Sequence, residues 1–259
     1  MGVGLKKIPI YLINLDSDQV RLEFMDRQLQ SIGLAYERFP AIPGTALPGW
    51  IKPYFLNDDG CLASGLSKGE VGCYASHLSL INKVHRSGKA GLIMEDDLQL
   101  PEDLPDILNA IIAVDIDFDI LRLTFGNRSL KVASARLATG HKLVKYARVP
   151  ACLGAYIISP KGAEKFLNWK QVRTEPVDID MRSTWDCGMK TYGLLPVPIT
   201  QNVLESSINK MNSDICTQRY LKNPRPHMTG LRRFYYNITW LGMHGSLRSL
   251  LGNTDTVIE

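Results

Sequence analysis

Long hydrophobic runs and a strong net charge are both missing from this sequence. The chain has 259 residues and a formal net charge of +4. No apolar stretch approaches the roughly 20 residues that a transmembrane helix requires. So small a charge gives no reason to expect nucleic acid as a partner. Two lysines precede an apolar stretch near the start, but Pro9 and Asn14 interrupt it, so we expect a strand there and not a signal peptide.

Cysteine is also sparse, and the chain has no CxxC pair. Five widely spaced cysteines predict reduced, mostly structural thiols and a cytoplasmic location. Cys73 and His77 stand four residues apart and His85 follows, so a zinc site is conceivable, although no second close pair of ligands supports it. The chain lacks a GxxxxGK[ST] loop, which argues against Mg²⁺-dependent phosphoryl transfer.

Strand-like and helix-like segments alternate through most of the chain. Residues 8–15 and 36–42 have the apolar character of strands on either side of an amphipathic helix, and further strands are expected near 91–94, 119–124, 151–159 and 192–199. Ser67 and Glu70 form a capping box for a helix that ends at Gly88. This alternation predicts one Rossmann-type α/β domain with a mostly parallel sheet over residues 1–210.

Residues 211–259 differ in composition from the rest. No acid lies between Asp214 and Asp255, whereas arginines, lysines and aromatic residues interleave there. Over residues 231–251 the apolar side chains Leu231, Phe234, Tyr235, Ile238, Leu241 and Leu247 fall near helical spacing. We expect a basic amphipathic helix that either lies on an anionic membrane surface or docks on the α/β domain.

Three consecutive acids, Glu95, Asp96 and Asp97, directly follow the apolar run 91–94. Adjacent carboxylates repel one another unless a cation or an ion-pair partner compensates them. Ligands of doubly wound sheets bind beyond the carboxyl ends of the strands, and oxygen-only ligands suit Mg²⁺ or Mn²⁺. The alternative is an exposed acidic turn or the first turn of a helix.

Six segments follow one another along the chain: INLDSDQVR, LSKGEVGCYASHLSLI, LIMEDDLQL, GAYIISPKGAEKFL, EPVDIDM and QNVLESSI. In this order they resemble glycosyltransferase family 25, whose bacterial members build lipooligosaccharide and whose animal relatives modify collagen. The resemblance covers about residues 8–208 and implies a GT-A fold, a nucleotide-sugar donor that is usually UDP-galactose, and inverting, β-linked transfer.

The resemblance implies roles for the acids. The EDD triplet matches the family's version of the DXD metal motif, so Asp97 and Glu95 are the expected ligands of Mn²⁺ or Mg²⁺. Glu95 or Asp96 would also hold the ribose or an ordered water. A cation there would neutralise the diphosphate of the donor and stabilise the leaving group.

The resemblance also implies donor-site roles for residues outside the triplet. Asn14, Asp16 and Arg21 lie at the end of the first strand and in the following helix, and Arg21 would pair with a phosphate or the uracil edge. A solvated helix arginine is the plainer interpretation. His77 would line the donor site, although a lone histidine on a helix is more often structural.

Inverting transfer requires a base that takes the proton of the acceptor hydroxyl. Asp178 matches the family's Pro-Val-Asp and is the predicted base, with Asp180 and Asp186 as alternatives. Asp178 could instead cap a helix after Pro176. Trp185 could stack on an acceptor sugar or belong to the core.

The sequence therefore predicts a metal-dependent UDP-sugar glycosyltransferase, most simply a β-galactosyltransferase. Its acceptor would be a saccharide of lipooligosaccharide or lipopolysaccharide, reached from the cytoplasm, with a possible peripheral contact at the inner face of the membrane. A glucosyltransferase of the same family and a non-catalytic sugar-binding or adhesion protein are the alternatives. Release of UDP on addition of acceptor distinguishes the enzymes from the binding protein.

Overall fold

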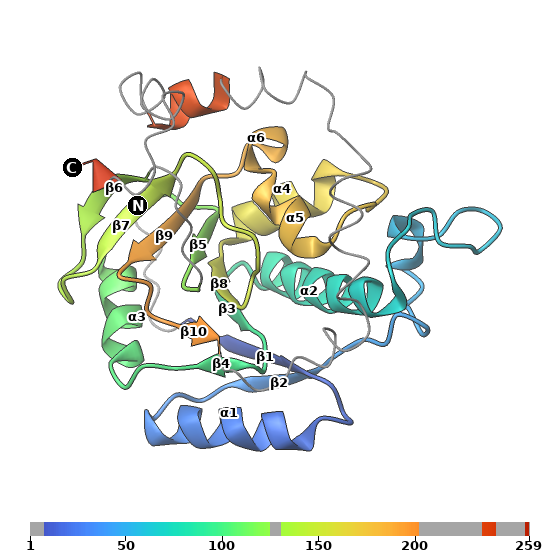
Figure 1. The fold of residues 1–259 in the computed structure, drawn as a ribbon, viewed down its shortest axis with the longest axis horizontal. Coiled ribbons are helices and arrows are strands. Elements are labelled where there is room, and N and C mark those ends of the chain that lie inside the picture. Colours follow the sequence, from blue (N-terminus) through green and yellow to red (C-terminus); the bar gives the residue numbers. More distant parts are fainter. Residues whose placement is uncertain (1–7, 125–130, 202–234, 242–256, 259) are drawn as a thin grey trace.

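A mixed β-sheet with helices on both faces forms the centre of the computed structural model (Figure 1). The structure describes residues 8–124, 131–201, 235–241 and 257–258. The strand order in the large sheet is β11-β6-β7-β9-β5-β8-β3-β1-β2, and β10 pairs with β4 in a separate ribbon. The strands are β1 (Ile10–Asn14), β2 (Glu37–Pro40), β3 (Gly91–Met94), β4 (Leu98–Gln99), β5 (Ile120–Arg122), β6 (Lys131–Arg136), β7 (Lys142–Tyr146), β8 (Ala155–Ile158), β9 (Thr191–Leu195), β10 (Thr200–Gln201) and β11 (Val257–Ile258).

Six α-helices and one short 3-10 helix with defined bounds accompany these strands in the described ranges. They are α1 (Gln19–Ser31), the 3-10 helix η1 (Lys52–Tyr54), α2 (Lys68–Ser87), α3 (Leu104–Ala113), α4 (Pro160–Trp169), α5 (Val177–Arg182) and α6 (Thr184–Cys187). The expected capping box of α2 is confirmed, since Ser67 and Glu70 exchange both bonds, and Gly88 ends the helix at φ 65°. The N-cap of α1 is Asp18, whose side chain accepts a hydrogen bond from the backbone N–H of Arg21.

The sheet is mixed, which corrects the expectation of a mostly parallel sheet. β1 is parallel to β2 and β3, β5 to β9, and β6 to β11. However, β8 enters antiparallel between β3 and β5, and β7 is antiparallel to both β6 and β9. A strand that is buried on both faces is apolar throughout, so its sequence does not reveal its direction.

Each face of the sheet has its own apolar core. Along β1, Ile10 and Leu12 contribute to the core that α1 and α3 cover, whereas Tyr11 and Ile13 contribute to the core beneath α2, α4 and α5. The strands β3 and β8 divide their side chains between the two cores in the same alternating way. This period-2 alternation with apolar residues on both faces is what a fully covered sheet requires.

Helix α2 lies unusually close to the loop that follows β2, because glycines face each other there. A Cβ atom on Gly72 would lie 2.5 Å from the carbonyl oxygen of Ile42 and 2.8 Å from the backbone nitrogen of Gly44. A Cβ atom on Gly44 would lie 1.9 Å from the carbonyl oxygen of Lys68. The hydroxyl of Ser76 also accepts a hydrogen bond from the backbone N–H of Ile42. Backbone contact therefore sets the position of α2.

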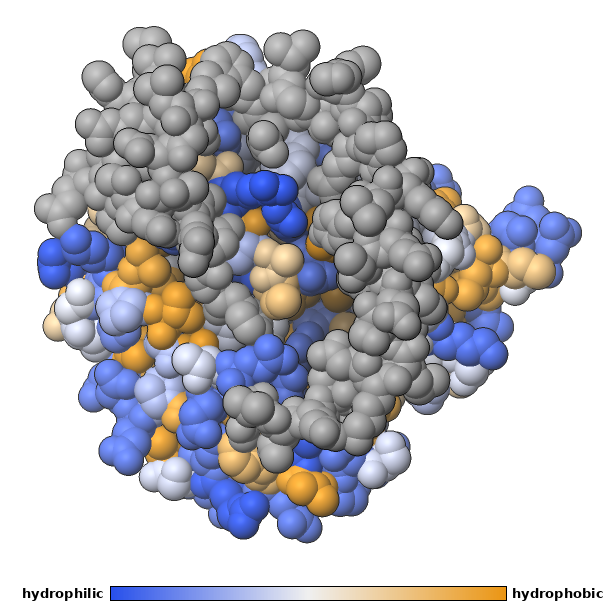
Figure 2. All heavy atoms as spheres, viewed as in Figure 1, coloured by the Kyte–Doolittle hydropathy of each residue, from blue (hydrophilic) through white to orange (hydrophobic). Residues whose placement is uncertain are grey.

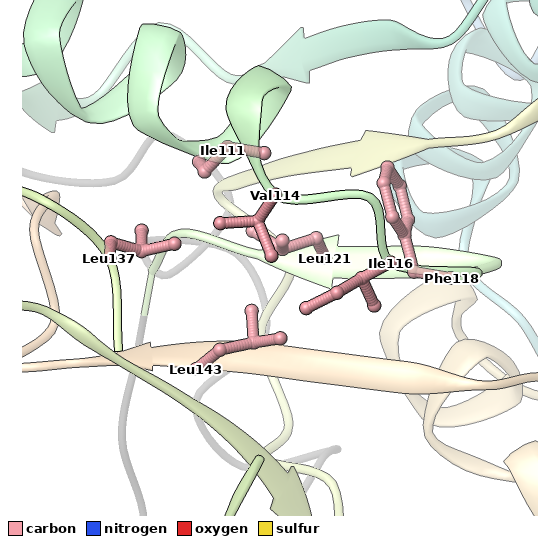
Figure 3. A pocket seen from close by; sticks show the side chains of 7 residues that line it. All are labelled: Ile111, Val114, Ile116, Phe118, Leu121, Leu137 and Leu143. Atoms are coloured by element: carbon pink, nitrogen blue, oxygen red, sulfur yellow. The ribbon is translucent and has the colours of Figure 1, made fainter. Parts of the chain in front are cut away.

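A small apolar cavity lies on the α3 side of the sheet (Figure 3). Its volume is about 10 Å³, close to the minimum that holds one water molecule. A cavity this small, with only apolar side chains around it, is a packing defect and not a substrate site. The lining side chains are Ile111, Val114, Ile116, Phe118, Leu121, Leu137 and Leu143.

Residues 235–241 are helical and contact the strands β7 and β9. The hydroxyl of Tyr236 donates to the carbonyl oxygen of Met189 at 2.6 Å. Trp240 packs edge-on against Tyr192 with ring centroids 5.0 Å apart, and the Nζ atom of Lys145 lies 4.8 Å from the Trp240 ring centroid. This part of the C-terminal segment is therefore docked on the α/β domain.

The docked face is offset from the stripe that the sequence predicted. Leu241 is buried, but Tyr235, which the stripe included, is 73% exposed. The rest of the predicted helix over 231–251 falls outside the described residues, as does the proposed boundary near residue 210. Within the described ranges, no helix has the length and apolar character needed to cross a membrane.

Candidate active site

The three acids lie where the carboxyl ends of two neighbouring strands meet. β1 and β3 are parallel and adjacent, so Asn14 at the end of β1 lies beside Glu95–Asp97 after β3. Figure 2 shows hydrophilic and apolar residues next to one another near the centre of the viewed face, where Figure 1 places β3, β8 and helix α5. Although the three acids are consecutive, each has different partners.

Asp96 joins β1, α1 and β3. The Nδ2 atom of Asn14 donates to its Oδ2 at 2.8 Å, and the Nη1 atom of Arg21 donates to its Oδ1 at 3.0 Å. Burial raises the pKa of Asp96, while the bonds from Asn14 and the charge of Arg21 oppose that rise. In this structure both oxygens of Asp96 are engaged in holding the strand ends together.

Asp97 has one oxygen with a partner and one without. The Nε2 atom of Gln201, on β10, donates to Oδ2 at 2.9 Å. Oδ1 is buried and has no hydrogen-bond partner among the described residues. Burial is the main cause that raises the pKa of Asp97, and the charge of Glu95 raises it further. A buried carboxylate oxygen without a donor is costly, and a hard divalent cation would compensate it. The residues present therefore fit the expected metal.

Glu95 is held by a histidine on α2. The Nε2 atom of His77 lies 3.2 Å from its Oε1, and the Nδ1 atom of His77 lies 2.9 Å from the hydroxyl of Tyr156, on β8. His77 and Tyr156 are both buried, with their rings stacked at 5.8 Å between centroids. The hydroxyl of Tyr156 can donate or accept, so it is compatible with either tautomer of the ring. The structure thus places His77 beside Glu95, and its part in the donor site stays a prediction.

Cys73 joins His77 and Glu95 in one cluster. One ligand atom from each of the three side chains lies within 4.8 Å of the others. Burial and then the charges of Glu95, Asp178 and other acids raise the pKa of the Cys73 thiol well above its ordinary value. His85, the third residue of the conceivable zinc site, is exposed and does not belong to this cluster.

Asp178 lies in the first turn of α5 without capping it. Its Oδ2 accepts a hydrogen bond of 3.0 Å from the backbone N–H of Cys152. Cys152 has a left-handed backbone, with φ 65°, a conformation that costs a residue other than glycine on the order of 1–3 kcal/mol. The buried guanidinium of Arg122 donates from Nη2 to the carbonyl oxygen of Cys152. Arg122 and Cys152 therefore fix the backbone that contacts Asp178.

The two other acids considered as bases have different surroundings. Asp180 is 2% exposed, accepts from the hydroxyl of Tyr74 at 2.8 Å and pairs with the Nζ atom of Lys170 at 3.3 Å. Asp186 is exposed on α6, and Trp185 beside it is half-buried. Asp180 is thus a buried carboxylate whose charge is compensated. Asp178 is half-buried, and its charge, like that of Glu95, raises the pKa of the Cys73 thiol.

Asp16 lies at the edge of the site. Its side chain is 77% exposed, and its Oδ1 pairs with the Nη2 atom of Arg38 at 2.6 Å. The Nε atom of Arg38 donates to the Oδ1 atom of Asn14 at 3.1 Å. Arg38 lies on β2 beside Leu12 of β1, so it links Asp16 to the strand ends.

Sequence reasoning missed several of these partners. Tyr156 and Gln201 gave no local signal, because a buried aromatic on a strand and an isolated glutamine are ordinary features. Arg122 did give one, since a charged residue inside the apolar run 119–124 must find partners when buried. Cys152 could not be recognised, because its role depends on backbone conformation.

A comparison with protein families decides the identity of this chain. The model described as glycosyltransferase family 25 (LPS biosynthesis protein) matches residues 7–181. The chain belongs to glycosyltransferase family 25. The match includes the three acids after β3, the Cys73 and His77 positions on α2, and Asp178.

Similar proteins come from animals and bacteria. A glycosyltransferase 25 family member of Drosophila melanogaster is 30% identical over 189 residues, covering 65% of this chain and 29% of that protein. Procollagen galactosyltransferase 1 of Danio rerio is 27% identical over 186 residues, covering 65% and 29%. A putative glycosyltransferase of Haemophilus influenzae is 25% identical over 175 residues, covering 67% and 61%. This family 25 chain thus spans less than a third of the length of these two animal relatives.

Among solved structures, the inositol-1-phosphate CTP transferase from T. maritima aligns with this family 25 protein. The alignment has a TM-score of 0.36 and 12% identity, and it covers 77% of this chain and 74% of the other. A TM-score this low does not establish a common fold.

Proposed function

We propose that this family 25 protein transfers a hexose, most simply galactose, from a UDP-sugar to a saccharide acceptor of lipooligosaccharide or lipopolysaccharide, inverting the anomeric centre. The family description names LPS biosynthesis, and the relative in Danio rerio is named a galactosyltransferase. The family description favours a saccharide acceptor, and the name of the relative favours a galactose donor. Glucose remains the alternative donor, because the two hexoses differ at a single hydroxyl. A GT-A arrangement of the sheet is part of this proposal.

The observation that carries the proposal is the buried Oδ1 atom of Asp97 beyond the carboxyl end of β3, which has no hydrogen-bond partner within the part of the chain that the structure describes. Asp97 would hold Mn²⁺ or Mg²⁺ through this oxygen, with Glu95 as the second expected ligand. When bound, the ion would supply the positive charge that stabilises the departing diphosphate. Oxygen ligands at a strand end fit this role better than an acidic surface turn does, because Asp97 is buried.

The donor side of the site would be framed by Asn14, Arg21 and Asp96. Their mutual hydrogen bonds fix the ends of β1 and β3. Arg21 adds positive charge beside the acids, where the diphosphate of the donor would lie. Asp16 lies at the exposed edge, and His77 holds Glu95. Each of these residues would orient the donor or the acids and would not take part in proton transfer.

Asp178 would act as the base. The hydrogen bond from the Cys152 N–H to Oδ2 holds the carboxylate in place and leaves Oδ1 for the acceptor. Oδ1 would take the proton of the acceptor hydroxyl as that hydroxyl attacks the anomeric carbon. The half-buried position of Asp178 leaves it accessible to an acceptor, in contrast to Asp180.

The decisive experiment measures UDP release from UDP-galactose, UDP-glucose and UDP-N-acetylglucosamine. Each donor is incubated with and without Mn²⁺, and with and without a lipooligosaccharide acceptor. We expect acceptor-dependent UDP release that is greatest with UDP-galactose and is abolished by EDTA. Binding of UDP without any release on addition of acceptor would favour a non-catalytic binding protein. Full activity in excess EDTA would overturn the metal assignment.

A further inference from the structure

Cys73 and His77 present a sulfur and a nitrogen ligand to the same carboxylate. The two residues are four apart on α2, so their side chains lie on one face of the helix. Glu95 follows β3 and faces this pair, with its Oε1 3.2 Å from the Nε2 atom of His77. All three ligand atoms lie within 4.8 Å of one another. Small side-chain movements would bring them around a single ion.

This set of ligands differs in chemistry from the oxygen atom of Asp97. Thiolate sulfur, imidazole nitrogen and carboxylate oxygen are the ligands that Zn²⁺ takes, and three protein ligands with one open position are usual where Zn²⁺ also binds water or a substrate. Mg²⁺ and Mn²⁺ prefer oxygen and gain little from a thiolate. The two sets of ligands therefore select different ions.

A partner behind the histidine supports a metal-binding role. The hydroxyl of Tyr156 lies 2.9 Å from the Nδ1 atom of His77. If the hydroxyl accepts a hydrogen bond from Nδ1–H, Nε2 is left free for a metal ion, and such an outer partner is usual for metal-binding histidines. Tyr156 is fully buried and its ring stacks on that of His77, so the imidazole is held in place.

The charges around the cluster favour a cation. The four charged groups that act most strongly on the Cys73 thiol are all acids, and they come from three different parts of the chain: Glu95 and Asp97 after β3, Asp178 on α5 and Glu70 on α2. An ion of charge +2 would be attracted by all four.

We propose that Cys73, His77 and Glu95 form a Zn²⁺ site beside the Asp97 oxygen. Binding releases the thiol proton of Cys73 to solvent as the sulfur–zinc bond forms. Because Glu95 serves both ions, Zn²⁺ bound here competes with Mn²⁺ at the donor site and inhibits transfer. This inhibition rests on the proposed function, whereas the binding itself does not.

The test uses the full chain and Co²⁺ as a spectroscopic substitute for Zn²⁺. We expect one equivalent of Co²⁺ to produce a thiolate-to-cobalt charge-transfer band, which Zn²⁺ removes by displacement. Cys73→Ser should lose the band, and Cys61→Ser, which changes an exposed cysteine, should keep it. No band in the unaltered protein, a band that persists in Cys73→Ser, or a band lost only in Cys152→Ser would each overturn the proposal.

Two further variants test the Zn²⁺ site without altering its three ligands and without relying on transferase activity. Tyr156→Phe should weaken Zn²⁺ binding by about 10–100-fold, as expected for loss of an outer partner, and unchanged affinity would count against the site. Asp97→Asn should keep the cobalt band even though it loses Mn²⁺-dependent activity. A failure of the proposed function alone would leave the cobalt band and its response to Cys73→Ser unchanged.

Discussion

At the scale of single residues, the buried Oδ1 atom of Asp97 has consequences for stability. Burial raises the pKa of this carboxyl, so the fold disfavours its ionised form. A carboxyl whose pKa is raised by folding stabilises the fold fully below its unfolded pKa, and that contribution is lost as the pH rises through the folded pKa. At neutral pH the ionised Asp97 carboxylate therefore destabilises the fold, and binding of a cation would offset that cost.

The first prediction concerns Asp97→Asn. Activity should fall by at least about 10²–10³, the usual effect of removing one electrostatic stabiliser of the transition state. The melting temperature near pH 7 should equal or exceed that of the unaltered protein, and the difference should vanish as the pH falls toward about 4. Thermal melts from pH 4 to 8 measure this. A variant that is clearly less stable at pH 7 would show that the carboxylate is a structural requirement.

The second prediction concerns the base. Asp178→Asn should lower kcat by about 10²–10⁴ while UDP affinity stays the same, because general base catalysis contributes that much. Asp186→Asn is a matched control, since it changes an exposed acid on the neighbouring helix α6 and should leave kcat unchanged. Steady-state kinetics with UDP titrations separate the two effects. A collapse of UDP affinity in Asp178→Asn would place this residue in the donor site instead.

At the scale of secondary-structure elements, α5 owes its position to the segment that precedes it. The guanidinium of Arg173 is fully buried and lies 4.7 Å from the ring of Phe166 and 5.5 Å from the rings of Tyr54 and Trp169. Its Nη2 donates to the carbonyl oxygen of Phe166 at 2.7 Å. Its charge also lowers the pKa of buried Asp180, opposing the effect of burial. Arg173 thus anchors the chain shortly before Asp178.

The third prediction follows from this anchor. Arg173→Met should lower the free energy of unfolding by on the order of 3 kcal/mol, because it leaves the buried Asp180 carboxylate less compensated. It should also lower kcat, since α5 carries Asp178. Urea denaturation measures the stability change, with Arg86→Ala on the exposed end of α2 as a control that should stay within about 0.5 kcal/mol. Equal stabilities in the two variants would show that Arg173 is not an anchor.

Local patterns predicted elements well but not their directions. The Ser67 capping box and the glycine that ends α2 both depend on a few consecutive residues, and the structure confirms them. The antiparallel entry of β8 depends on partners far along the chain, which an apolar run does not specify. The same distinction applies to the site: Asp97 was predicted from its neighbours, whereas its partner Gln201 is distant in sequence.

At the scale of the whole molecule, residues 235–241 bear on the choice between docking and membrane contact. The ring of Trp240 contacts Tyr192 and the ammonium group of Lys145, and Leu241 is buried against the domain. Side chains used in this way are not available to a lipid surface. We therefore expect this part of the chain to stabilise the domain.

The fourth prediction separates the two alternatives. Trp240→Ala should lower the free energy of unfolding by about 1–3 kcal/mol, less than a fully buried tryptophan would cost, while Tyr235→Ala on the exposed side should change it little. Cosedimentation with anionic vesicles at low salt should be unaffected by Trp240→Ala. Vesicle binding that is lost in Trp240→Ala, with stability unchanged, would support membrane contact by this segment.

The contact between α2 and the loop after β2 limits how the site can change. Since Gly72 and Gly44 meet with no side chain between them, the helix that carries Cys73 and His77 cannot move closer, and a single methyl group would push it away. Gly72→Ala should therefore change the distance between His77 and Glu95 even though neither residue is altered. The spacing between α2 and the loop after β2 is set by bare backbone and leaves no room for gradual adjustment.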